Sequence, residues 1–204
     1  MPSLDRSVTF RKYRFLVDPE VYFPAEDTFL FADHLSVGLN ETVMDMGTGC
    51  GFFAILSAEK ASDVLAVDIN PRAVACTRKN VVQNSVGTKV ETFVGDLFNP
   101  IRSGVGFDLI LFNAPYLPVE VDEGDAWIQM AWAGGSDGRC VIERFIDQVP
   151  NYLSKEGRVL LMQSTLSSPE ATLRRFKKQG LNPRIIAEEH CFFEKIALIE
   201  ASRK

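Results

Sequence analysis

The strongest constraint on the fold is a regular alternation of short apolar runs with amphipathic, helix-like segments along most of this 204-residue chain. Strands that alternate with helices form a mostly parallel sheet that is covered by helices on both faces. The expected strands are residues 42–46, 64–67, 90–94, 109–113, 158–162, 184–187 and 195–200. The expected helices are residues 26–36, 52–60, 72–83, 139–152 and 169–178.

The last two expected strands break this alternation. Only residues 188–194 separate them, which is too short a connection for a helical crossover, so the two strands should pair as an antiparallel hairpin. A doubly wound, mostly parallel α/β sheet with such a C-terminal hairpin resembles the seven-stranded, Rossmann-like fold of class I S-adenosylmethionine (SAM) methyltransferases. We therefore expect residues 1–20 to form an N-terminal extension and residues 21–204 to form a single SAM-dependent methyltransferase domain.

Net charge, apolar runs and cysteine spacing indicate which kinds of binding partner and which cell compartment to expect. The formal net charge is −5, whereas proteins that grip duplex nucleic acid usually carry a basic face. No apolar run reaches the roughly 18 residues of a membrane span, and the N-terminus lacks the apolar region of a secretory signal. The four cysteines show no C-x-x-C spacing and only two histidines accompany them, so we expect no metal site and a cytoplasmic protein with reduced thiols.

A glycine-rich turn, DMGTGCG at residues 45–51, follows the strand expected at residues 42–46. Its glycines permit a tight turn and let a ligand approach the backbone closely. A G-x-G pattern alone is common in nucleotide-binding turns, but here an acid stands two residues before the first glycine. A carboxylate is unfavourable beside a pyrophosphate and favourable beside the sulfonium and α-amino groups of SAM. The expected cofactor contacts in this turn are Asp45, Gly47, Thr48, Gly49 and Gly51.

Two more acids follow the neighbouring strands. Asp68 ends the next strand and can accept hydrogen bonds from both ribose hydroxyls, while Asp96 follows the third strand and can accept one from the adenine amino group. The carboxyl ends of parallel strands share one edge of the sheet, where open α/β sheets bind ligands. The sequence therefore predicts that Asp68, Ile69, Asp96 and Leu97 complete the SAM site.

The segment Asn113-Ala114-Pro115-Tyr116 ends the fourth strand and should face the methyl donor. An amide nitrogen is a poor nucleophile because its lone pair is delocalised into the carbonyl group. The side-chain oxygen of Asn113 and the backbone carbonyl of Ala114 can each accept one N–H and hold the nitrogen in line with the methyl carbon. Pro115 stiffens the loop and Tyr116 offers a π-face to a flat acceptor. These four residues are the predicted catalytic motif, and Asn113 should also border the cofactor.

The motif resembles the N-P-P-Y box of methyltransferases that modify adenine N6 or glutamine N5. From about residue 20 to its end, the chain resembles the HemK/PrmC-like release-factor glutamine methyltransferases, in the single-domain form of archaea and eukaryotes. The resemblance is carried by VYFPAEDTFL (21–30), the glycine turn, DINP (68–71), NAPYLP (113–118) and AWAGG (131–135), together with Gly138, Arg139, Arg144 and Phe145.

This resemblance implies that the methyl acceptor is the glutamine of the Gly-Gly-Gln loop of a class-one translation release factor. It implies that Asn113 holds the glutamine amide and that S-adenosylhomocysteine is the second product. It also implies a small zinc-binding activator protein that adds its sheet to an edge strand, here Val90–Val94. The cofactor contacts that it implies are Thr28, Gly47, Asp68 and Asp96.

Two residues depart from the family pattern. Ala114 replaces the first proline of the box, which keeps the backbone carbonyl but removes roughly 0.5–1 kcal/mol of loop stiffening. Phe23 stands where relatives usually carry glutamate. Three other functions remain open at this point: methylation of adenine N6 or guanine N2 on a flipped base, methylation of a protein lysine, and SAM binding without catalysis.

Overall fold

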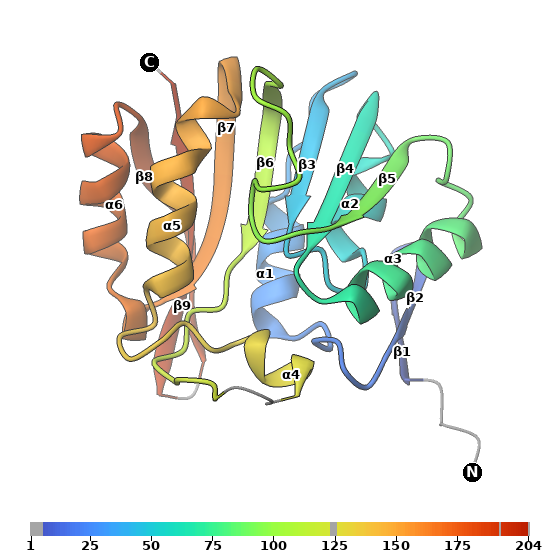
Figure 1. Ribbon diagram of the computed structural model, residues 1–204, viewed down its shortest axis with the longest axis horizontal. Coiled ribbons are helices and arrows are strands. Elements are labelled where there is room, and N and C mark those ends of the chain that lie inside the picture. Colours follow the sequence, from blue (N-terminus) through green and yellow to red (C-terminus); the bar gives the residue numbers. More distant parts are fainter. Residues whose placement is uncertain (1–5, 123–125, 192, 204) are drawn as a thin grey trace.

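The computed structural model describes residues 6–122, 126–191 and 193–203, with a seven-stranded sheet, a two-stranded hairpin and helices on both faces of the larger sheet (Figure 1). The strands are β1 (Arg6–Phe10), β2 (Tyr13–Val17), β3 (Thr42–Met46), β4 (Asp63–Asp68), β5 (Val90–Val94), β6 (Phe107–Asn113), β7 (Leu153–Ser164), β8 (Asn182–Cys191) and β9 (Glu194–Ser202). The helices are α1 (Glu26–His34), α2 (Phe52–Ser57), α3 (Pro71–Gln83), α4 (Trp127–Met130), α5 (Cys140–Gln148) and α6 (Pro169–Lys178), with short 3-10 turns at Val149–Asn151 and Thr165–Ser167.

The strand order of the larger sheet is β5-β4-β3-β6-β7-β9-β8. The strands from β3 to β7 pair in parallel, and β9 lies antiparallel between β7 and β8. This confirms the predicted class I fold with its C-terminal hairpin. The strand order reverses between β3 and β6, and a ligand crevice opens at such a point, at the carboxyl ends of the strands.

Alternate residues of the central strands supply two separate apolar layers, because successive side chains of a strand point to opposite faces. Val43 of β3 pairs with Leu109 of β6, and both face the layer beneath α1, α2 and α3. The next pair, Met44 and Ile110, faces the layer beneath α5 and α6. Burial on both faces explains why the centres of these strands are mostly apolar.

The hairpin β1–β2 lies within the residues that the sequence analysis treated as an extension. Tyr13, Phe15 and Val17 of β2 belong to the same buried cluster as the residues of α2. Two carboxamides, one on α3 and one just after its end, bind the backbone at the free edge of β2. Asn80 accepts from the backbone N–H of Leu16 and donates to its carbonyl at 2.9 and 2.8 Å, and Asn84 does the same for Arg14 at 3.1 and 2.8 Å. The boundary at residue 21 stays a prediction, but β2 packs as part of the core.

Several predicted element ends were wrong. α2 ends at Ser57 rather than residue 60, and α5 spans Cys140–Gln148 rather than 139–152. Pro150 has no N–H to continue the helical ladder, and the chain tightens there into the 3-10 turn. The strand predicted at 158–162 extends over Leu153–Ser164. None of the helices in the described ranges is both long and apolar enough to cross a bilayer.

Candidate active site

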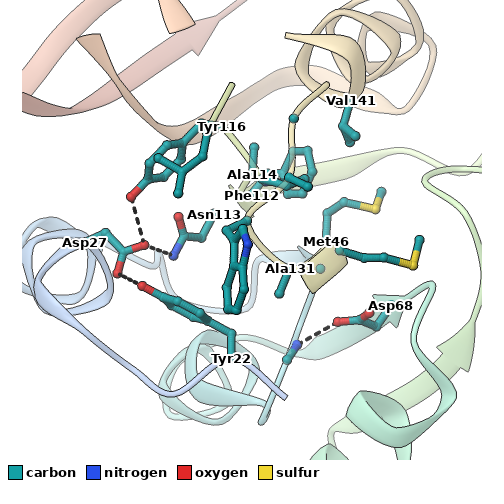
Figure 2. Close-up of a pocket in the computed structure, with 18 of the residues that line it drawn as sticks. Tyr22, Asp27, Met46, Asp68, Phe112, Asn113, Ala114, Tyr116, Ala131 and Val141 are labelled. Atoms are coloured by element: carbon teal, nitrogen blue, oxygen red, sulfur yellow. Dashed lines mark hydrogen bonds between the residues drawn. The ribbon is translucent and has the colours of Figure 1, made fainter. Parts of the chain in front are cut away.

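A cavity of about 830 Å³ opens at the carboxyl ends of β3, β4 and β6. Its floor is formed by the glycine turn after β3, by residues 68–70 after β4 and by residues 95–97 after β5. The segment 112–117 and the segments 21–28 and 130–135 form its walls, and Figure 2 shows a close-up of this pocket. Pockets of this size commonly hold a cofactor or a drug-sized ligand.

The glycine turn presents backbone to the cavity. Gly47 has φ of 65°, a conformation that side chains disfavour, and an added Cβ would lie 3.2 Å from the Phe112 ring. Gly47, Thr48 and Gly49 all line the cavity. The amide of Thr48 donates to the carbonyl of Val67 at 3.1 Å, and this bond anchors the turn to β4.

Two predicted contacts in this turn lie behind the wall rather than on it. Asp45 is fully buried, and its Oδ2 accepts from the Thr48 hydroxyl at 2.7 Å and the Ala54 amide at 2.9 Å. Gly51 precedes α2, where an added Cβ would meet Thr77 at 2.8 Å. Neither residue is among those that line the cavity. Both shape the turn from behind.

Asp68 lies on the cavity wall and ties two turns together. One carboxylate oxygen accepts from the Gly49 amide and the other from the Asn70 amide, each at 2.9 Å. Burial raises the pKa of Asp68 to about 6 and that of Asp45 to about 7, because the charged form is poorly solvated there. A bound cation or a set of hydroxyl donors would favour the ionised forms.

Asp96 and Leu97 border the far end of the cavity. The carboxylate of Asp96 pairs with the guanidinium of Arg144 on α5, and Leu97 is buried with φ of 50°. The resemblance pointed to Arg144, but sequence spacing gave no sign that it reaches Asp96. Ile69 also lines the cavity and is 43% exposed.

The predicted catalytic motif lines the cavity in full, and its asparagine is held by a residue that the sequence analysis did not single out. The Asn113 side chain donates from Nδ2 to Oδ2 of Asp27 at 2.9 Å. The hydroxyls of Tyr22 and Tyr116 also donate to Asp27, at 3.0 and 3.5 Å, and Figure 2 shows its carboxylate between the two rings. Asn113 Oδ1 is buried and has no hydrogen-bond partner among the described residues. The only early signal of Asp27 was its place in segment 21–30.

Residues 131–139, part of the family resemblance, fold against the loop that carries the predicted catalytic motif. Leu117 donates to the carbonyl of Trp132 at 2.9 Å and accepts from the amide of Gly134 at 2.8 Å. Gly138 has φ of 73°, and an added Cβ would lie 2.3 Å from the carbonyl oxygen of Tyr116. A glycine is therefore required for this close approach. Residues 131–139 support the wall that carries Tyr116.

The acceptor end of the cavity is suited to a neutral group that donates N–H. Burial, followed by the nearby charge of Asp27, raises the pKa values of both Tyr22 and Tyr116. These phenols therefore stay protonated at neutral pH and do not act as bases. The site offers orienting hydrogen bonds and an apolar wall, which suits transfer to a nitrogen that needs alignment more than deprotonation.

A sheet of this order, a glycine turn after β3 and an Asn-x-Pro-Tyr motif after β6 define a class I SAM-dependent methyltransferase. The family model of the methyltransferase small domain matches residues 14–182. The chain therefore belongs to the methyltransferase small domain family. Membership implies SAM as the methyl donor.

Named relatives extend this result. The chain is 40% identical over 187 residues to a Methanocaldococcus jannaschii protein named as a candidate protein N5-glutamine methyltransferase, covering 91% of this chain and 93% of that protein. It is 36% identical to methyltransferase HEMK2 of Homo sapiens, covering 79% of this chain and 80% of HEMK2. Among solved structures, the Mtq2–Trm112 complex of E. cuniculi, described as responsible for methylation of the termination factor eRF1, matches with a TM-score of 0.70 and 25% identity over 91% of this chain and 99% of that chain.

Proposed function

We propose that this enzyme transfers the methyl group of SAM to the side-chain nitrogen of glutamine in the Gly-Gly-Gln loop of a class-one translation release factor. The observation that carries the proposal is the state of Asn113, whose Nδ2 is held by Asp27 while its buried Oδ1 lacks a partner at the cavity wall. The names of the relatives at 40% and 36% identity and of the Mtq2 complex support the same substrate class.

The carboxylates of Asp68 and Asp96 and the exposed backbone of the glycine turn support SAM as the ligand of this cavity. Asp68 would hold the ribose, and Asp96, Ile69 and Leu97 would border the adenine. The methionine part would lie against Thr28 and the exposed backbone of Gly47, Thr48 and Gly49. Asp45 and Gly51 would act from behind by fixing the turn, and Asn113 would border the transferred group. S-adenosylhomocysteine would leave this same cavity.

Alignment of the acceptor nitrogen is the main task of the protein. SAM supplies an electrophilic methyl group on a sulfonium. Asn113 Oδ1 and the carbonyl of Ala114 would each accept one N–H of the glutamine amide, and the Tyr116 ring and Pro115 would flank its plane. The nitrogen becomes acidic once methylated and can lose its proton to water, so no side-chain base is required.

A small zinc-binding activator protein is the partner that we propose for the exposed edge of β5. This strand lies at one edge of the sheet, and its side chains Phe93 and Val94 are 42% and 54% exposed. Apolar side chains on a free strand edge suit the addition of a partner strand. The Mtq2 structure is itself a complex with Trm112, which supports a protein partner for this chain. A cytoplasmic location follows from a substrate that acts in translation.

The test is methyl transfer from labelled SAM to the cognate release factor, to total tRNA and to genomic DNA in parallel, with and without an activator protein of the Trm112 type. We expect label on the release factor that disappears when its Gly-Gly-Gln glutamine is replaced. Label on nucleic acid alone, or on lysine of a basic protein alone, would overturn the substrate and leave the fold and cofactor assignments standing. No label under any condition would argue for binding without catalysis.

A further inference from the structure

Asp27 is a buried carboxylate at the acceptor end of the cavity, 5% exposed, and its partners in the described residues are all neutral donors. Its Oδ1 accepts from the Tyr22 hydroxyl at 3.0 Å and from the backbone amide and hydroxyl of Thr28 at 2.6 and 3.2 Å. Its Oδ2 accepts from Asn113 at 2.9 Å and from Tyr116 at 3.5 Å. Burial of an anion is expensive, and these hydrogen bonds offset that cost.

An ionised carboxylate can only accept hydrogen bonds, whereas a carboxamide has one donating and one accepting end. Contact with Asp27 therefore sets the orientation of the Asn113 carboxamide. The NH2 end must face Asp27, which leaves Oδ1 on the side away from it, buried and unpartnered. The reverse orientation would bring two acceptor oxygens together within a low-dielectric wall.

We propose that Asp27 is a positioning residue that locks the Asn113 carboxamide with its oxygen toward the acceptor. The cavity then selects groups that bring N–H and rejects groups that bring only acceptor oxygens. A glutamine passes this test, and a glutamate at the same place does not. The selectivity part of this inference rests on the proposed function, whereas the orientation of Asn113 can be measured on the free protein.

Three variants at positions 22 and 27 offer matched comparisons. Tyr22→Phe removes a donor from Asp27 Oδ1 and leaves the Asn113 contact on Oδ2 intact. Asp27→Asn keeps the shape but gives position 27 a donor of its own, so that Asn113 can satisfy either end and rotate. Asp27→Glu keeps the charge and should restore part of the lock.

The first experiment is nuclear magnetic resonance of the isotope-labelled free protein. We expect a scalar coupling through the hydrogen bond between Nδ2 of Asn113 and the carboxylate carbon of Asp27, and slow exchange of the Asn113 amide protons with water. Both signatures should persist in Tyr22→Phe and vanish in Asp27→Asn. Rapid exchange of the Asn113 amide protons and no scalar coupling in the wild-type protein would overturn the proposal. Because this measurement uses the wild-type protein, it does not depend on whether the Asp27 variant folds.

The second experiment tests whether Asp27 acts on catalysis through Asn113. With the release factor as acceptor, Asp27→Asn should lower kcat by about 100-fold, the typical effect of misplacing a reacting group, while the Kd for SAM stays within about twofold. Combined with Asn113→Ala, it should add no further loss, because Asp27 acts through Asn113. Additive losses would overturn the proposal. If the scalar coupling between Asn113 and Asp27 is present but the protein never methylates the release factor, only the proposed function is refuted.

Discussion

At the residue scale, the site depends on polar atoms whose partners are fixed by their neighbours. Asp68 is shared between two backbone amides, and Asn113 is held at one end only. The roles of these two residues can be separated, since Asp68 borders the proposed ribose position and Asn113 the proposed acceptor. Each therefore gives a different kinetic signature when it is replaced.

The variant Asn113→Ala should lose at least about 100-fold in kcat, because the acceptor nitrogen is no longer aligned, with little change in SAM affinity. Single-turnover methyl transfer and calorimetric titration with SAM measure the two effects. Asn151→Ala, at an exposed asparagine far along the chain, is the matched control and should resemble the wild type. A large loss of SAM affinity in Asn113→Ala would mean that the assigned role is wrong.

The buried carboxylate of Asp68 should make both the stability and the SAM affinity of the protein depend on pH. Burial raises its pKa from the usual 3.8 to about 6, so the folded protein holds a proton that the unfolded chain releases between these values. The free energy of unfolding of the free protein should therefore fall as pH rises from about 4 to 6. Binding of the ribose favours the ionised form, so SAM affinity should weaken by up to about tenfold per pH unit below pH 6.

Thermal unfolding and calorimetric titration with SAM between about pH 4 and 8 measure these two effects. Asp68→Asn should bind SAM weakly at every pH, without the dependence below pH 6. Asp45, with a pKa of about 7, titrates behind the turn and should broaden the wild-type profile. An identical profile in the wild type and in Asp68→Asn would contradict the ribose assignment.

At the scale of elements, the sequence predicted well those strands and turns that depend on residues close together in the chain. Apolar runs located the central strands, and the glycine turn and Asn113 motif located the crevice, because period and turn residues act over a few positions. Asp27 and its link to Asn113 were missed, since 86 positions separate the two residues and only the folded sheet brings them together. Helix ends were misplaced where packing and Pro150 overrode the apolar pattern.

The β1–β2 hairpin was missed because its alternation is short and lies before the recognisable core. Its attachment to α3 gives a prediction. Asn80→Ala removes the partner of both backbone groups of Leu16 and of the Cys50 carbonyl, which leaves buried polar groups unpaired. The free energy of unfolding should fall by about 3 kcal/mol or more.

Urea unfolding measures this change, and hydrogen exchange should show faster exchange at the Leu16 amide. Val82→Ala is the matched control on the same helix, since Val82 is 75% exposed, and it should change stability by no more than about 0.5 kcal/mol. Equal stability of both variants would mean that the asparagine does not anchor β2.

At the scale of the whole molecule, β5 is one of the two edge strands of the larger sheet, whereas the cavity opens at the carboxyl ends of the central strands. A partner on β5 would therefore stabilise the enzyme without covering the crevice. Val94→Glu should prevent formation of the complex with a Trm112-type protein, measured by co-purification and calorimetry. Leu39→Glu, at a side chain that is 81% exposed outside the sheet, should leave the complex intact. Retained binding in Val94→Glu would place the partner elsewhere.

The proposed reaction transfers a methyl group to a glutamine amide that Asn113 holds. The most direct measurement is tandem mass spectrometry of the Gly-Gly-Gln peptide after the release factor has been incubated with SAM and the enzyme. We expect one added methyl group on the side-chain nitrogen of that glutamine with the wild-type enzyme, and none with Asn113→Ala. A methyl group on any other residue, or an unmodified peptide beside methylated nucleic acid, would contradict it.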